Sequence, residues 1–373
     1  MSGVFDLRRF LILGVLIVLS ACAPRGIMTV VPPDTVPGPT TSVFVGSTRM
    51  LAANGTYGTE RFEGMNYGRF DISVPPVRQA GEINWPKRAN KPNVTTDFLT
   101  TQRVFHPDGA AFRSDLSKAL NARGKTAIIY VHGYNNTFTE GLYRIAQLSH
   151  DLNVPGVAVH YSWPSAAEPL GYIYDRDSAL FARDGLERLI RDVAAAGAQR
   201  ITLVSHSMGG ALVMEALRQI DLRDGRILRQ IDGVILISPD IDVDVFRSQA
   251  LSIGELPQPF VIFGSGKDSV LRLSSLITGQ NGRVGSMDDV TRVADLNVTY
   301  LDVAAFSSGN GHFVAGTSEA LLLLLGRITD VSTAFAGDRA GRTGLLTGAV
   351  LTVRRATRVI LSPVGELTGE RLN

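Results

Sequence analysis

The chain has 373 residues, a formal net charge of +2 and a single cysteine. A nearly neutral chain does not have the basic surface by which proteins bind nucleic acid, so we expect no nucleic-acid partner. One cysteine excludes both an intrachain disulfide and a metal site built on several thiolates.

The amino terminus predicts a bacterial lipoprotein signal peptide over residues 1–21. Arg8 and Arg9 precede an apolar run over residues 10–19. About ten apolar residues are too few to cross a bilayer, so a cleaved signal is favoured over a permanent span. The run ends in Leu-Ser-Ala-Cys at residues 19–22, which resembles a lipoprotein cleavage box.

Cys22 is therefore the predicted site of lipidation, and acyl chains there would anchor the protein to a membrane. Ala23 follows in place of an aspartate, which resembles outer-membrane retention. We expect a lipoprotein of the cell envelope, on the periplasmic face of the outer membrane in a bacterium with two membranes. Residues 22–42 are rich in proline and predict an extended tether, which the globular domain follows at Val43.

Residues 43–330 predict one α/β domain with a mostly parallel sheet and helices on both faces. Apolar runs alternate with helix-like segments such as Asp177–Ala196, where apolar residues recur at helical spacing. The mixed signals over Val43–Pro107, including the alternating stretch Tyr67–Val74, predict antiparallel first strands.

Two strand-like runs are each followed by a loop that can supply catalytic groups. The run Lys125–Val131 ends in a His-Gly-Tyr-Asn loop, where the backbone N–H of Tyr134 is the predicted oxyanion donor. The run from Ile201 stops at Ser207 and continues as a helix beginning with Met208. A serine in so sharp a strand-to-helix turn is typical of a nucleophile, with the Met208 N–H as the second oxyanion donor.

Three later residues are candidates for the other members of a triad. Asp240 and Asp268 each end a strand-like run. His312 lies in a loop after the apolar run Val298–Phe306, where a last strand would deliver a base, and it is the only histidine beyond Ser207. The remaining histidines, His106, His132, His150, His160 and His206, precede the serine, and His132, His160 and His206 are interpreted as structural.

Together these segments resemble a bacterial branch of the α/β-hydrolase superfamily with esterase-like and lipase-like members. The resemblance covers residues 65–325 and rests on the motifs His132–Asn135, Tyr161–Ser165, His206–Gly209, Ser238–Asp242 and Gly311–His312. It implies an α/β-hydrolase fold and a triad in the chain order serine, acid, histidine. The acid usually follows the fifth strand of this arrangement, which favours Asp268, and Asp240 is the alternative.

The expected function is a membrane-anchored serine hydrolase that cleaves a carboxylic ester in a small molecule or lipid. An amidase or acyltransferase would use the same triad, and a scaffold protein that retains the fold without turnover is the other alternative. No cofactor and no metal site are predicted, because glycine-rich nucleotide loops and ligand clusters are missing from the sequence. The sequence predicts no particular fold for the basic segment 331–373, which is expected to be either a membrane-surface segment or a disordered or partner-binding tail.

Overall fold

The computed structural model describes residues 25–153, 155–279, 282–306, 312, 314–318, 347–353 and 356–362. The predicted signal peptide and the predicted lipidation site Cys22 lie outside the described residues. Within those described ranges, no helix is long and apolar enough to cross a bilayer.

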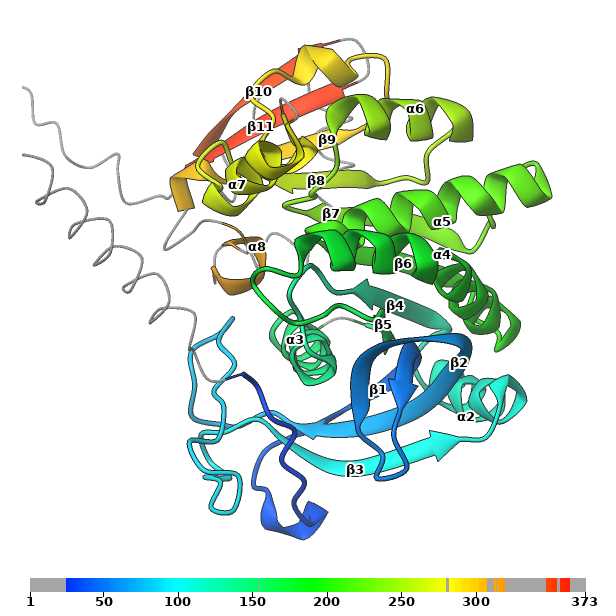
Figure 1. Cartoon of the computed structure of the whole chain (residues 1–373), viewed down its shortest axis with the longest axis vertical. Coiled ribbons are helices and arrows are strands. Elements are labelled where there is room, and N and C mark those ends of the chain that lie inside the picture. The colour runs from blue at the N-terminus through cyan, green and yellow to red at the C-terminus, as the bar shows by residue number, and fades with distance from the viewer. Residues whose placement is uncertain are drawn as a thin grey trace, which may run out of the picture.

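One sheet of eleven strands runs through the whole molecule (Figure 1). From edge to edge the strand order is β10-β11-β9-β8-β7-β6-β4-β5-β1-β2-β3. All pairs from β11 to β1 are parallel, and only β1–β2, β2–β3 and β10–β11 are antiparallel. The strands are β1 (Thr40–Leu51), β2 (Tyr57–Ser73), β3 (Leu99–His106), β4 (Thr126–Val131), β5 (Val157–Ser162), β6 (Arg200–His206), β7 (Ile231–Ile237), β8 (Phe260–Gly264), β9 (Thr299–Asp302), β10 (Thr347–Val353) and β11 (Ala356–Ser362).

Helices cover both faces of this sheet, which confirms the predicted architecture. Side chains of α2, α4, α5 and α6 form one core with the strands, and side chains of α3 form a second core on the other face. The central strand β5 is buried along its whole length, as expected for a parallel strand covered on both sides. The helices are α2 (Gly109–Ala122), α3 (Phe138–Asp151), α4 (Tyr172–Ala195), α5 (Met208–Asp224), α6 (Val243–Ile253), α7 (Ser269–Thr278) and α8 (Val314–Thr317), with short 3₁₀ helices η1 (Pro33–Thr35), η2 (Val284–Ser286), η3 (Val290–Val293) and η4 (Ala304–Phe306).

Side chains fix the start of three helices next to the carboxyl edge of the sheet. At α3, Thr137 and Glu140 form a capping box, in which each side chain accepts a hydrogen bond from the other residue's backbone N–H. Asp242 and Asp268 cap α6 and α7 in the simpler way, by accepting from backbone N–H groups of the first turn. The helices therefore begin at fixed points beside the strand ends.

The structure corrects one expectation about a strand boundary. The strand expected over Val298–Phe306 ends at Asp302, because the Asp302 carboxylate accepts from Ala304 N at 3.0 Å and turns the chain into η4. The antiparallel pairing predicted for the first strands is confirmed, because β1 pairs with β2 and β2 pairs with β3 in antiparallel fashion. The other edge of β1 pairs in parallel with β5.

The segment expected to act as a tether is packed on the domain along its described part. Val31 N donates to Thr100 O at 2.9 Å, and Thr100 N donates to Thr29 O at 2.9 Å. These bonds add a short parallel bridge beside β3. An extended chain rich in proline has few internal hydrogen bonds, so its backbone groups are available to pair with an adjacent strand edge.

The basic segment 331–373, for which the sequence predicts no particular fold, contributes β10 and β11, which extend the sheet beyond residue 330. β11 pairs in parallel with β9, and β10 pairs with β11 as an antiparallel hairpin. The outer edge of β9 would otherwise present a row of unpaired backbone groups. The sequence of these strands is rich in valine, threonine and leucine, which suits a strand pairing there.

Candidate active site

Ser207 lies in the sharp turn between β6 and α5. Its backbone has φ 52° and ψ −124°, a strained conformation for a residue with a side chain. Hydrogen bonds hold the turn in place: Ser207 N donates to Ile237 O at 3.0 Å, and Ser207 O accepts from Asp240 N at 3.1 Å. Strain of this kind at the carboxyl edge of a parallel sheet is typical of a nucleophile elbow.

Two glycines allow the chain to pack closely around this turn. A methyl group on Gly209 would come within 2.5 Å of His132 O, so the first turn of α5 is pressed against the end of β4. A methyl group on Gly133 would come within 2.9 Å of the Ser207 Cβ. The loop after β4, which carries Tyr134, therefore passes directly beside the serine.

The predicted oxyanion donors are the neighbours of the two residues that meet here, because Met208 follows Ser207 and Tyr134 follows Gly133. Met208 is the first residue of α5, so its N–H has no partner within the helix. Tyr134 follows Gly133, its hydroxyl donates to the carbonyl of Pro169, and its ring lies 5.5 Å from the Tyr172 ring. These contacts hold the side chain of Tyr134, and its backbone N–H lies in the loop that passes beside Ser207.

Asp268 and His312 are brought together beside His206, the residue that precedes Ser207. His312 Nδ1 lies 2.8 Å from Asp268 Oδ2, and the Asp268 side chain is fully buried. The other carboxylate oxygen accepts from the backbone N–H groups of Val270 and Leu271, both at 3.0 Å. The His312 ring lies 4.7 Å from the ring of His206, the residue before Ser207.

Asp240, the alternative acid, is engaged by other groups. One of its carboxylate oxygens lies 3.1 Å from Arg283 Nε and accepts from Ser274 Oγ at 2.6 Å, and the other accepts from Tyr172 Oη at 3.0 Å. The negative charge of Asp240 and burial raise the pKa of Tyr172 to about 12, burial having the larger effect. This buried network ties the end of β7 to α4 and α7.

A buried arginine that sequence reasoning missed supports the loop after β4. Arg49 of β1 is 1 % exposed and donates to the carbonyls of Asn136 at 2.8 Å and Ser165 at 3.0 Å. Its Nε donates to Ser162 Oγ at 3.0 Å. Burial lowers the pKa of this guanidinium to about 10. An arginine within the strand-like sequence of β1 indicates a buried charge, but its partners Asn136 and Ser165 are distant in sequence and could not be identified from it.

Asp175 of α4 was missed for the same reason. Its carboxylate accepts from Asn135 N at 2.9 Å, Ala166 N at 2.6 Å and Ser165 Oγ at 2.6 Å. Burial raises the pKa of this carboxyl group, against the effect of these hydrogen bonds. Asn135 itself has a φ of 56°, so its bond to Asp175 helps to hold a strained backbone. Arg49 and Asp175 together fix the loop beside Ser207 to the loop after β5.

Three other histidines are buried around the site. His132 stacks on Trp163 at 4.8 Å, and its two ring nitrogens lie 2.9 and 3.0 Å from backbone carbonyls. His206 Nε2 lies 3.2 Å from His312 O. Burial lowers the pKa of His132 and His206 well below the ordinary value, and it lowers that of His160 to about 3. They are therefore neutral packing groups at neutral pH.

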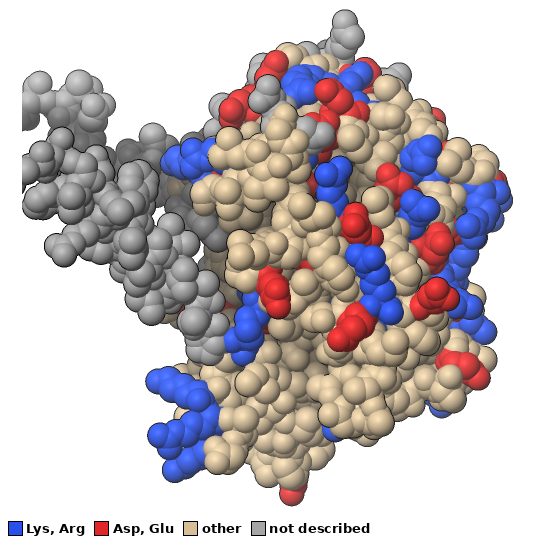
Figure 2. All heavy atoms as spheres, viewed as in Figure 1, with Lys and Arg blue, Asp and Glu red and all other residues tan. Residues whose placement is uncertain are grey.

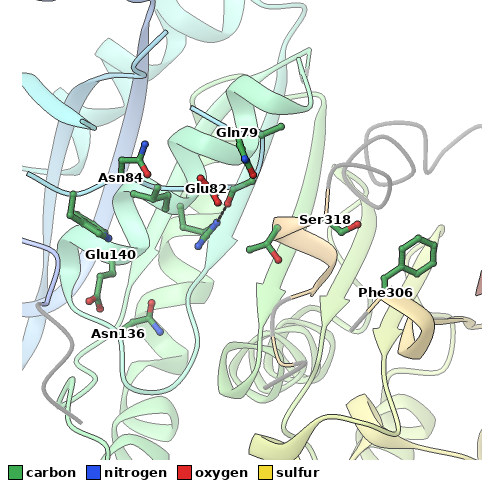
Figure 3. A pocket seen from close by; sticks show the side chains of 13 residues that line it. Gln79, Glu82, Asn84, Asn136, Glu140, Phe306 and Ser318 are labelled. Carbon is green, nitrogen blue, oxygen red and sulfur yellow. Dashed lines mark hydrogen bonds between the residues drawn. The ribbon is translucent and has the colours of Figure 1, made fainter. Parts of the chain in front are cut away.

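A hollow of about 710 Å³ adjoins the loop after β4. Asn84, Asn136 and Glu140 lie on one wall, and Phe306 and Ser318 lie across from them (Figure 3). Its lining is mostly polar. Among the described residues, no group of three or more histidine, cysteine, aspartate or glutamate side chains could hold a metal ion.

The family model described as "Alpha/beta hydrolase of unknown function (DUF900)" matches residues 108–314, more than half of the chain. The chain belongs to this family. The matched range of this α/β hydrolase includes Ser207, Asp268 and His312, and it ends four residues before the hollow's last lining residue, Ser318.

Two solved structures resemble parts of this α/β hydrolase. Lipase B from Aspergillus fumigatus is 16% identical with a TM-score of 0.37, over 54% of this chain and 51% of that chain. The hydrolase thus spans about half the length of that lipase. A YdeN-like hydrolase from Pectobacterium atrosepticum is 13% identical with a TM-score of 0.31, over 58% of this chain and 98% of that chain. A search of curated proteins gives no match.

Proposed function

We propose that this α/β hydrolase is a serine hydrolase that cleaves carboxylic esters through an acyl-enzyme. The observation that carries the proposal is the hydrogen bond between buried Asp268 and His312, next to a serine in a strained elbow. A purely structural role would require neither the strained serine nor an imidazole oriented by a buried carboxylate.

The chemistry follows from the orientation of the imidazole. With Nδ1 donating to Asp268, a neutral His312 ring carries its acceptor lone pair on Nε2. Nε2 accepts the hydroxyl proton as Ser207 Oγ attacks the carbonyl carbon of the ester, and the charge of the imidazolium is stabilised by Asp268. The N–H groups of Met208 and Tyr134 stabilise the oxyanion.

The tetrahedral intermediate then loses its alcohol, which takes the proton from His312 Nε2. A water molecule then gives a proton to the same nitrogen and attacks the acyl-enzyme, and Ser207 Oγ takes this proton from His312 as the bond to the acyl group breaks and the carboxylic acid leaves. The same steps with an amide, or with an alcohol in place of water, give an amidase or an acyltransferase. We propose an ester as the substrate because its alcohol is a better leaving group than the amine of an amide.

The test is labelling by a fluorophosphonate probe, which reacts with activated serines. The full chain is compared with Ser207→Ala and His312→Ala, and folding of each is checked by circular dichroism. We expect labelling of the parent, none of Ser207→Ala and a collapse in His312→Ala. A folded parent that is not labelled would instead support the scaffold alternative.

We also propose that lipidated Cys22 anchors the enzyme to a membrane of the cell envelope, on the periplasmic face of the outer membrane in a bacterium with two membranes. The support is the sequence alone, in which a short apolar run is followed by Leu-Ser-Ala-Cys. An ester-containing lipid or small molecule in that compartment is the proposed substrate.

A further inference from the structure

The outer side of α7 is apolar and exposed to solvent. Leu273, Leu276 and Ile277 are 57%, 80% and 53% exposed, whereas Leu271 and Ser274 of the same helix face inward and are buried. Large aliphatic side chains that lie together on a surface are unusual unless they meet a partner. In the view of Figure 2, the surface over α7 is largely without charged side chains.

The start of α4 adds two more aliphatic side chains beside α7. Leu170 is 97% exposed and Ile173 is 70% exposed. Tyr172, between them, is buried, and its hydroxyl lies 3.0 Å from Ser274 Oγ on α7. The two elements are therefore in contact. We call Leu170, Ile173, Leu273, Leu276 and Ile277 the apolar rim.

The elements that carry the apolar rim begin at the same edge of the sheet as Ser207. α4 follows β5, and α7 follows β8. Both strands are part of the parallel sheet whose strand β6 leads into Ser207. Carboxyl ends of parallel strands share one edge of a sheet, so the rim and the serine lie at the same edge.

The described chain also begins at this edge. Arg25 donates to Asn135 Oδ1 at 2.9 Å and to Asn135 O at 2.8 Å, and it pairs with Glu140 at 2.9 Å. Asn135 follows β4, another strand of the parallel sheet. Cys22 is three residues before Arg25, so even a fully extended chain places the two Cα atoms within about 11 Å of each other.

The charges on the α7 side of the rim fit an anionic surface, whereas on its α4 side Glu168, Arg176 and Asp177 are all exposed. From residue 266 to residue 279, the exposed charged side chains are those of Lys267 and Arg272. The only acidic residue of that segment, Asp268, is buried against His312. Cations beside aliphatic side chains are favoured at the surface of a bilayer with anionic headgroups.

We infer that the apolar rim inserts into a lipid bilayer, so that the active site faces the membrane. This inference rests on the proposed anchor at Cys22, which brings the same edge of the sheet to the bilayer. A substrate ester would then enter from the membrane side, next to the loop that carries Tyr134.

The first test measures whether the rim is surrounded by water or by lipid, and it does not require enzymatic activity. The full chain is purified with Cys22 lipidated, so that this sulfur is blocked, and Leu276→Cys then supplies the only free thiol, which is labelled with a nitrobenzoxadiazole fluorophore. The protein is mixed with vesicles of phosphatidylglycerol and phosphatidylethanolamine. The matched control is Leu222→Cys, because Leu222 is 63% exposed near the end of α5, at the opposite edge of the sheet.

We expect vesicles to raise the emission of the label at Leu276 and nitroxide-bearing acyl chains to quench it, while the label at Leu222 stays in water. Equal responses at the two positions would overturn the inference. So would a label at Leu276 that is already shielded from water before vesicles are added, because another part of the protein would then cover the rim.

The second test uses the double variant Leu273→Glu, Leu276→Glu and the control Leu222→Glu. The double variant should hydrolyse an ester dispersed in vesicles about 10-fold more slowly, with a water-soluble ester cleaved at the parent rate. Equal rates on both esters would overturn the inference. If the parent cleaves neither ester, the proposed function fails, whereas the fluorescence result still decides whether the rim enters lipid.

Discussion

The imidazole of His312 and the carboxylate of Asp268 are joined by a hydrogen bond of 2.8 Å at the carboxyl edge of the sheet. Asp268→Asn should therefore reduce turnover of a nitrophenyl ester by about 10³–10⁴-fold, because the amide no longer stabilises the imidazolium or fixes its tautomer. The change is read as kcat on the purified chain.

Asp240→Asn is the control for that prediction. It breaks the buried pair with Arg283 and should lower the free energy of unfolding by about 3 kcal/mol, with turnover of the remaining folded protein close to the parent value. Equal losses of turnover in the two variants would contradict the assignment of Asp268 as the acid.

Gly133→Ala should inactivate the enzyme because of a local clash. The new methyl group would meet the Ser207 Cβ at 2.9 Å and His206 Nδ1 at 2.7 Å, so the loop must move away from the serine. We expect a loss of at least about 100-fold in kcat and about 1–3 kcal/mol in stability. Gly233→Ala in β7 is the control, since its nearest atoms would be 3.5 Å away. A fully active Gly133→Ala would show that this loop takes no part.

Arg49→Met should destabilise the protein far more than Arg25→Met. Arg49 is buried, and its loss would leave the carbonyls of Asn136 and Ser165 without a donor, at a cost of about 3 kcal/mol. Arg25 is partly exposed, and its ion pair contributes less than about 1 kcal/mol. Urea unfolding measures both. Similar values would mean that solvent reaches Arg49.

Acid should weaken the folded state through the buried histidines. Burial lowers the pKa of His132, His160 and His206 below the value of about 6.5 in an unfolded chain. The contribution of these neutral histidines to the free energy of unfolding is fully present above a pH of about 6.5. It is lost as the pH falls, because the unfolded chain then binds protons that the folded chain does not bind. Each histidine lowers the free energy of unfolding by up to about 1.4 kcal/mol for each unit by which the pH falls. For His160 this loss continues down to a pH of about 3.

The measurement is the urea midpoint at pH 8, 6.5 and 5, together with proton uptake on unfolding. His160→Gln should take up one proton fewer than the parent at pH 5. A midpoint that does not change across this range would show that the folded protein protonates these rings at no cost.

Cys22→Ser should release most of the protein from the membrane fraction of the cell and abolish incorporation of a labelled fatty acid. The reason is that an acylated cysteine buries long hydrocarbon chains, and the apolar rim alone offers a far smaller area. Phase separation in detergent measures the change. Unaltered membrane association would assign the anchor to another part of the chain.

The architecture of the sheet could be predicted because its signals are local. The runs ending at Val131 and His206 are apolar, and each is followed by small or polar residues that end a strand. The choice of Asp268 over Asp240 combined the count of strands before each aspartate with the position of the acid that the family resemblance implies.

The supports of the site could not be predicted from local patterns. Arg49 and Asp175 lie far along the chain from the loops that they hold, at Asn136 and Asn135 respectively. The sequence around Arg49 and Asp175 therefore does not indicate which residues they contact. The hairpin of β10 and β11 was missed similarly, because its place depends on the uncovered edge of β9.

The pairing of β9 with β11 has a consequence for biosynthesis. A chain emerging from a ribosome exposes β9 and His312 well before residues 356–362 exist. Until that last strand is made, β9 is an edge strand, and its carboxyl end leads toward the proposed base without a neighbour on one side. The sheet beside the proposed base would thus be complete only after residues 356–362 have been synthesised.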